Sequence, residues 1–188
     1  VQWEADDALG AAAAVADADE RVEQVLIVTP DKDLGQCVKG RRVVQYDRRK
    51  REIIDEDAVR EKFGVGPESI PDYLGLVGDT ADGFPGLPGW GAKSTSSVLA
   101  RYTHLENIPA EASLWEVEGL RGAAKLSKTL QDNMELAVLF RIIATVDLEV
   151  PVGTVDEWEW HGPTDEFAAF CDRMGVPALA HRAAALAR

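Results

Sequence analysis

The spacing of apolar residues divides the chain into a first part of strands and helices and a second part of helices alone. The β-branched run at 25–29, which Pro30 ends, is typical of a buried parallel strand. At 126–137, apolar residues recur every three or four positions, which predicts one face of a helix. This order of elements predicts an α/β half followed by a helical half. The expected strands are 25–29, 43–46 and 52–54, and the expected helices are 4–21, 55–63, 69–77, 92–102, 126–137 and an Ala-rich stretch after Pro151.

The composition is that of ordinary globular material. The 188 residues are 46% hydrophobic and 28% charged, enough for one domain with an appendage and a substantial core. No apolar run approaches the ~18 residues that a membrane span needs, and no secretory signal is visible, so no membrane partner is expected. Two cysteines, Cys37 and Cys171, cannot form a disulfide framework, which indicates a cytoplasmic location.

Charge is strongly segregated along the chain. The net charge of −13 argues against a protein that coats nucleic acid by bulk charge. Nevertheless, seven of the 20 basic residues fall within positions 39–51, including Arg48, Arg49 and Arg51 in the expected turn between two strands. Such a patch fits a contact with a phosphate backbone, and it fits equally well a solvated turn with exposed arginines.

Three short acidic clusters stand at the junctions between expected elements. The cluster at 4–7 opens a helix, the one at 31–33 follows a strand, and the one at 79–82 ends a helix. Each alone is commonly a helix cap or solvated surface, but converging carboxylates require bound cations or protons. A ligand set of oxygens without histidine suits Mg²⁺ or Mn²⁺ rather than zinc. Two such ions ~4 Å apart would suit cleavage of a phosphodiester bond.

A loop rich in glycine and proline lies between two expected helices. Its sequence is Gly86-Leu-Pro-Gly89-Trp-Gly91-Ala-Lys93-Ser94. Closely spaced glycines let a backbone approach a ligand, and the next helix begins with free N–H groups that suit phosphate. Most Gly-x-Gly sequences are simply turns, but the helix–hairpin–helix setting favours a loop that grips a nucleic-acid backbone without reading its sequence.

Taken together, the acidic clusters and the glycine loop resemble the 5′–3′ exonuclease/flap endonuclease family, which includes the N-terminal nuclease domain of bacterial DNA polymerase I. The sequences that carry the resemblance are Glu4-Ala-Asp6-Asp7, Thr29-Pro-Asp31-Lys-Asp33-Leu and Gly78-Asp79-Thr-Ala-Asp82-Gly-Phe-Pro-Gly86-Leu-Pro-Gly-Trp-Gly91-Ala-Lys93-Ser94. The resemblance implies a PIN-like, Rossmann-like parallel sheet, incomplete at its N-terminus, followed by a helix–three-turn–helix region. The implied divisions are a metal-binding α/β part at 1–65, a DNA-binding part at 66–152 and a helical extension at 153–188.

The resemblance also implies the ligands and the reaction. Two Mg²⁺ or Mn²⁺ ions would be held by carboxylates, and K⁺ would bind main-chain carbonyls of the glycine loop. The implied metal ligands are Glu4, Asp6 and Asp7 from one helix start, with Asp31, Asp33, Asp79 and Asp82 for the second metal, and Asp7, Asp31, Asp33 and Asp82 are the implied catalytic residues. The implied DNA-binding residues are Gly86, Gly89, Gly91, Lys93 and Ser94, together with Arg48, Arg49 and Arg51.

Three functions follow as alternatives. The first is a two-metal 5′–3′ exonuclease or 5′-flap endonuclease, which acts on DNA during replication or repair and leaves 5′-phosphate products. The second is a DNA-binding fragment of such a nuclease that does not catalyse, because the family's first metal-binding strand and its basic arch would precede Val1. The third is an unrelated Asp-x-Asp phosphatase, which would leave the glycine loop unexplained.

Overall fold

The computed structural model describes residues 2–187 and divides the chain into two compact units. The first unit ends at Val152 and the second begins at Gly153. Within the described residues, no helix combines the length and the apolar character needed to cross a lipid bilayer.

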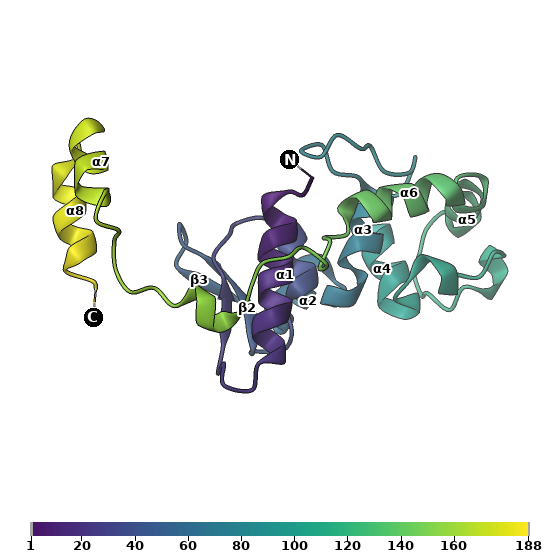
Figure 1. Ribbon diagram of the computed structural model, residues 1–188. Helices are drawn as coiled ribbons and strands as arrows, with labels where there is room; N and C mark the ends of the chain where they lie inside the picture. Colours follow the sequence, from purple (N-terminus) through teal and green to yellow (C-terminus); the bar gives the residue numbers. More distant parts are fainter. Residues whose placement is uncertain (1, 188) are drawn as a thin grey trace. The chain divides into compact units, whose positions relative to one another are not determined.

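A three-stranded sheet forms one side of the first unit (Figure 1). Strand β1 (Val25–Ile27) pairs in parallel with β2 (Val43–Asp47), and β2 pairs antiparallel with β3 (Glu52–Ile54). The sheet is therefore mixed, whereas a parallel sheet was expected. The reason is the short turn between β2 and β3, because a parallel connection requires a crossover of a dozen or more residues.

The first strand is shorter and less buried than the β-branched run predicts. Ile27 is 3% exposed and packs under α1 (Ala5–Ala18), which lies against one face of the sheet. Leu26 and Val28 point to the opposite face and are about half exposed, at 47% and 56%. Side chains alternate between the two faces of a strand, so a strand covered on one face buries only every second residue.

Helices make up the rest of the first unit. The end signals of α2 work as the sequence predicts: Asp55 accepts a hydrogen bond from the N–H of Ala58 at 3.0 Å, and Gly64 ends the helix with φ +72°. The helices are α2 (Glu56–Phe63), α3 (Ile70–Val77), α4 (Ala92–Tyr102), α5 (Ala123–Asp132) and α6 (Met134–Ala144).

The hydrophobic core of the first unit forms around α3, which packs against α4 and α6. Leu74 and Leu76 of α3 are 1% and 0% exposed. The rings of Phe84 and Phe140 stack with their centroids 5.3 Å apart. Because Phe84 belongs to the loop that follows α3, the core anchors a loop that carries acidic residues.

The prediction of a single helix over 126–137 is wrong, because Asn133 divides this stretch between α5 and α6. Asn133 has φ −132°, and its side-chain amide donates a hydrogen bond to the carbonyl of Thr129 at 2.8 Å. Asparagine side chains commonly compete in this way with the helical backbone. The apolar face continues past the break, since Leu130 and Ala137 are both fully buried.

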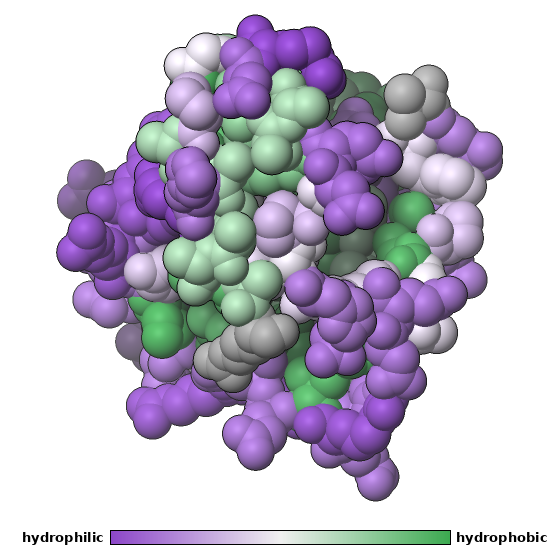
Figure 2. Space-filling model, turned by 60° about the vertical axis from the view of Figure 1, so that its left-hand side comes forward, coloured by the Kyte–Doolittle hydropathy of each residue, from purple (hydrophilic) through white to green (hydrophobic). Residues whose placement is uncertain are grey.

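The second unit contains two short helices, where one Ala-rich helix was expected. Helices α7 (Phe167–Arg173) and α8 (Pro177–Ala184) are separated by Gly175, which has φ +71°. Proline at the start of α8 suits a new first turn. Figure 2 shows one face of the molecule, where hydrophobic surface runs between hydrophilic residues.

Candidate metal centre and nucleic-acid interface

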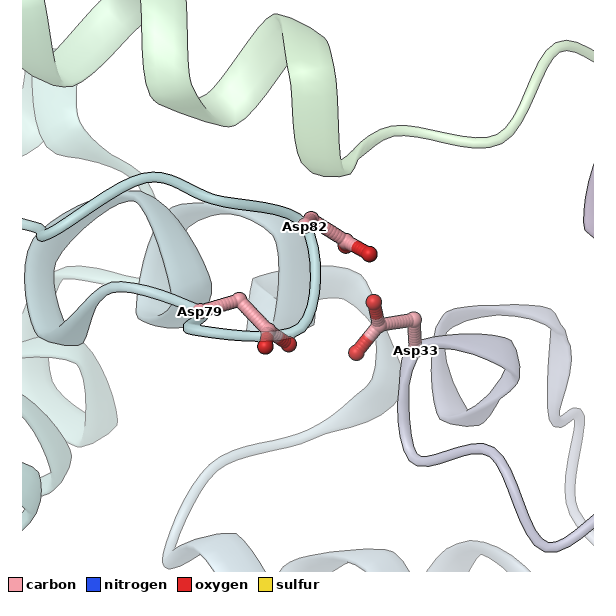
Figure 3. A group of neighbouring side chains, drawn as sticks. All are labelled: Asp33, Asp79 and Asp82. Atoms are coloured by element: carbon pink, nitrogen blue, oxygen red, sulfur yellow. The ribbon is translucent and has the colours of Figure 1, made fainter.

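Three aspartates from two distant segments meet beside the sheet. Asp33 begins a 3₁₀ helix (Asp33–Cys37) just after β1, and Asp79 and Asp82 lie in the loop that follows α3. Each offers a carboxylate oxygen, and these three oxygens lie within 4.8 Å of one another. Figure 3 shows the carboxylates of Asp33 and Asp82 pointing toward each other. The structure therefore brings together residues that the sequence separates by more than 40 positions.

The loop that carries Asp79 and Asp82 is closed by backbone contacts. The N–H of Asp79 donates to the carbonyl of Phe84 at 2.9 Å, and the N–H of Phe84 donates back at 3.0 Å. At its base, the backbones of Gly78 and Gly86 touch, so a Cβ on Gly86 would lie 2.4 Å from the Gly78 nitrogen. We call this contact the neck of the carboxylate loop. It explains why glycine occupies both positions.

The electrostatics of the three aspartates favour a cation. Burial raises the pKa of Asp33 to about 6, and the neighbouring charges of Asp31 and Asp79 act in the same direction. The Lys32 ammonium opposes this effect, donating to Asp33 at 3.1 Å and also to Asp79. Burial would likewise raise the pKa of Asp79, but hydrogen bonds from Lys32 and from backbone N–H groups lower it. The cluster already attracts one positive charge from the chain, and its oxygens suit a divalent cation.

The acidic start of α1 adjoins these aspartates. Burial raises the pKa of Asp6, and the charges of Asp31, Glu4, Asp82 and Asp7 raise it further. All three acidic clusters of the sequence thus contribute to one region of negative potential. A small cavity of about 40 Å³ there is lined in part by Glu4, Asp6, Asp7, Asp33 and Asp82.

Two of the predicted ligands also hold the backbone in place. Asp7 accepts hydrogen bonds from the N–H groups of Glu4 at 2.9 Å and of Asp147 at 2.8 Å. Asp31 accepts one from the N–H of Asp33 at 3.1 Å. A carboxylate has about four lone-pair sites, so these bonds leave capacity for a cation.

The glycine loop before α4 opens onto a groove of about 850 Å³ that Gly89, Gly91, Lys93 and Ser94 help to line. Gly91 has an extended backbone, with φ −130°, and a Cβ there would meet no atom within 4 Å. The protein's own packing therefore does not require glycine at position 91. Close approach of a ligand would require it. The Ser94 hydroxyl accepts the N–H of Gly91 at 3.1 Å and fixes the start of the helix.

Gly86 does not belong to this groove. It is buried and lies in the neck against Gly78. The expectation that its backbone approaches a phosphate is therefore corrected, because its surface is already occupied by protein.

The basic segment 39–51 separates into two groups. Arg48, Arg49, Lys50 and Arg51 are exposed on the β2–β3 turn, and no ion pair to their side chains is found in the described part of the chain. The other three form ion pairs within the fold: Lys39 and Arg42 share Asp17, and Arg41 pairs with Asp55. Within the segment 39–51, the free positive charge therefore lies on the turn.

Sequence reasoning missed two kinds of residue. Lys32 lies between two predicted ligands, and its position within Asp-Lys-Asp was the available signal. Arg121 and Lys125 line the same groove as the glycine loop. Their signal was a second glycine-flanked turn directly before a helix.

Family models match the whole first unit and extend into the second. Residues 1–64 match the 5′-3′ exonuclease N-terminal resolvase-like domain, and residues 65–166 match the 5′-3′ exonuclease C-terminal SAM fold. The DNA polymerase I of Bacillus caldotenax is 33% identical over 191 residues, covering 93% of this chain and 21% of that protein. The 5′-3′ exonuclease of Buchnera aphidicola is 30% identical over 149 residues, covering 79% of this chain and 51% of that protein. The chain thus spans about half or less of these relatives.

Solved structures share the fold. The T5 5′-exonuclease with bound zinc ions has a TM-score of 0.61 at 20% identity, covering 77% of this chain and 51% of that one. A bacteriophage T5 flap endonuclease complex with DNA and metal ions has a TM-score of 0.60 at 21% identity, covering 78% and 50%. The expected α/β part followed by a helical part is confirmed.

Proposed function

Because the chain belongs to the 5′-3′ exonuclease family, we propose that it is part of a metal-dependent nuclease that hydrolyses DNA at 5′ ends or 5′ flaps. The convergence of Asp33, Asp79 and Asp82 carries the proposal. DNA replication or repair is the corresponding process. The free thiols of Cys37 and Cys171 support the reducing cytoplasm as its location.

The carboxylates are proposed to hold two divalent cations, Mg²⁺ or Mn²⁺. Glu4, Asp6 and Asp7 would hold one, and the aspartates at 31–33 and 79–82 would hold the other. When bound, such ions acidify water and stabilise charge on the leaving oxygen. In the hydrolysis, a water oxygen bonds to phosphorus while the bond from phosphorus to the 3′ oxygen breaks. The water proton goes to solvent, the 3′ oxygen takes up a proton, and a 5′-phosphate results. The role of the protein's carboxylates would be to fix the positions of the cations relative to the scissile phosphate.

DNA binding is proposed for the glycine loop and the β2–β3 turn. Gly89 and Gly91 let the backbone approach a phosphate, and Lys93 and Ser94 add polar contacts. Arg48, Arg49 and Arg51 supply charge without base recognition, so binding should not depend on DNA sequence. Main-chain carbonyls of the glycine loop are proposed to hold K⁺.

The test is cleavage of a 5′-labelled flap DNA by this chain in Mg²⁺, in Mn²⁺ and in EDTA. We expect cleavage that EDTA abolishes and that Asp31→Ala removes while flap binding persists. Asp57→Ala is the matched control, because Asp57 is an exposed acid on α2, outside the cluster. Mn²⁺ affinity measured by calorimetry gives a readout independent of activity. Cleavage that survives Asp31→Ala would refute the assignment of this residue.

A DNA-binding fragment without catalysis is the second candidate. One observation favours it: the groove is lined by residues between 89 and 126 and by none of the clustered carboxylates. Flap binding without metal-dependent cleavage by the unaltered chain would support this candidate. The family match removes the third alternative, an unrelated Asp-x-Asp phosphatase.

A further inference from the structure

A second glycine turn faces the same groove as the glycine loop. Gly119-Leu-Arg-Gly122 directly precedes α5, as Gly89-Trp-Gly91 directly precedes α4. Both turns line the groove of about 850 Å³. We call the side formed by the 89–97 segment the first wall, and the side formed by the 119–126 segment the second wall. The proposed function assigns no role to the second wall.

The charge of the groove has one sign. Its lining contains three cationic side chains, Lys93, Arg121 and Lys125, and no acidic one. No hydrogen bond or ion pair to these side chains occurs among residues 2–187, although the chain carries a net charge of −13. A second groove, of about 710 Å³, has the opposite charge. Its lining includes Asp132 and Glu135 and no basic residue. Free cations gathered in a groove of an acidic protein indicate an anionic ligand.

The backbone of the second wall is also open to a ligand. Gly119 and Gly122 have φ +68° and +75°, and a Cβ on either would meet no atom within 4 Å. Gly122 makes no side-chain cap to α5, so the first N–H groups of that helix are left without a side-chain acceptor. Together with the side chains of Arg121 and Lys125, these groups suit phosphate oxygens.

The two walls are tied together. Trp90, between the two glycines of the first wall, donates its indole N–H to the carbonyl of Leu126 in α5 at 3.3 Å. Its ring also packs against Trp115, with centroids 6.1 Å apart. The Ser127 hydroxyl also fixes α5, by donating to the carbonyl of Ala110 at 2.5 Å. The width of the groove is therefore set by buried contacts rather than by exposed loops.

We propose that the second wall binds the DNA backbone, with Arg121 and Lys125 contacting phosphates of a strand that also contacts Lys93. This proposal rests on the proposed function. It adds the second wall of the groove to the DNA-binding residues of the first wall. No aromatic side chain lines the groove, so it offers no surface on which bases could stack. Its volume is in the range of pockets that hold ligands much larger than a single phosphate, which suits a stretch of sugar–phosphate backbone.

The test compares three substitutions on the second wall and on α5: Arg121→Gln, Lys125→Gln and Lys128→Gln. Lys128 is the matched control, because it lies one turn along α5 from Lys125 and is paired with Asp132 at 2.7 Å. Binding of a short blunt-ended DNA duplex is measured in EDTA, by fluorescence anisotropy, from about 50 to 200 mM salt. Arg121→Gln and Lys125→Gln should each weaken binding about tenfold and lower the salt slope by about 1, and Lys128→Gln should change neither.

The outcomes separate this inference from the proposed function. If Arg121→Gln and Lys125→Gln bind duplex as the unaltered chain does while Lys93→Gln weakens binding, the second wall does not bind DNA. The proposed DNA-binding function then stands on the first wall. If the unaltered chain binds no duplex, both fail. A Gly91→Ala variant provides a further check on the first wall, because the added Cβ would meet no protein atom within 4 Å, and it should weaken duplex binding without loss of stability. Thermal unfolding of each variant confirms that its fold is retained.

Discussion

Replacing Gly86 by alanine tests the neck of the carboxylate loop. The added Cβ would lie 2.4 Å from the Gly78 nitrogen and from the Val77 carbonyl carbon, distances at which backbone must move. The residue also has φ +69°, which costs an L side chain roughly 1–2 kcal/mol. Overpacking adds roughly 1–3 kcal/mol, so we expect a loss of about 2–5 kcal/mol in the free energy of unfolding. Gly83→Ala is the matched control, because Gly83 has φ +80° and open space around it.

Urea denaturation measures the loss as a change in midpoint at constant slope. Gly83→Ala should lose only the conformational part, roughly 1–2 kcal/mol. Because the neck positions Asp79 and Asp82, Gly86→Ala should also weaken Mn²⁺ binding, whereas Gly83→Ala should weaken it less. Equal losses of stability in the two variants would show that the close contact of Gly86 with Gly78 does not exist. Unchanged Mn²⁺ affinity in Gly86→Ala would show that the neck does not position the aspartates.

Two further predictions concern the stability and the reactivity of the first unit. Asp72 is 2% exposed and accepts hydrogen bonds from Arg141 at 3.0 Å and from the N–H of the buried Leu105 at 3.3 Å. Asp72→Ala should therefore cost about 3 kcal/mol in urea denaturation, because the Leu105 N–H loses its acceptor and Arg141 keeps the more exposed partner Glu106. Glu106→Ala, which removes a more exposed partner of Arg141, should cost less than about 1 kcal/mol, and equal costs would contradict this. Burial raises the pKa of Cys37 to about 11, so the folded protein holds little thiolate at neutral pH, and alkylation by iodoacetamide should accelerate only as the pH approaches that value. Mass spectrometry of the Cys37 peptide measures this rate, and labelling at neutral pH as fast as in urea would contradict the burial.

The elements that local sequence determines were predictable. Residues 92–102 form α4 as expected, because the helical spacing and the preceding Gly91 both lie within a few residues. The break at Asn133 was not predictable, since the apolar spacing continues across it and only the backbone departs from the helix. The antiparallel pairing of β2 with β3 could be predicted, because the turn at 47–51 is too short for a parallel connection.

The same distinction between local sequence and long-range packing applies to the candidate site. The acidic residues were recognisable one cluster at a time, because each lies at the end of an element. Which carboxylates share a cavity depends on the packing of the 79–85 loop against the 3₁₀ helix after β1, and no local pattern encodes that packing. Glycine shows the difference clearly. Gly86 and Gly91 belong to one sequence motif, yet the first packs against Gly78 and the second faces open space.

The opposite charges of the two sites require them to act together. Without cations, the carboxylates around Asp33 repel a phosphate, and the net charge of −13 repels DNA as a whole. Under the proposed function, attraction must therefore come from the free cations of the groove and of the β2–β3 turn, whose proposed phosphate contacts would release counterions. Divalent cations should then strengthen DNA binding to the unaltered chain at fixed ionic strength, because they reverse the repulsion by the carboxylates. They should strengthen it much less in Asp33→Asn, where fewer carboxylate charges remain to hold them. If both proteins gained equally, the added cations would be acting on the DNA rather than on the acidic cluster.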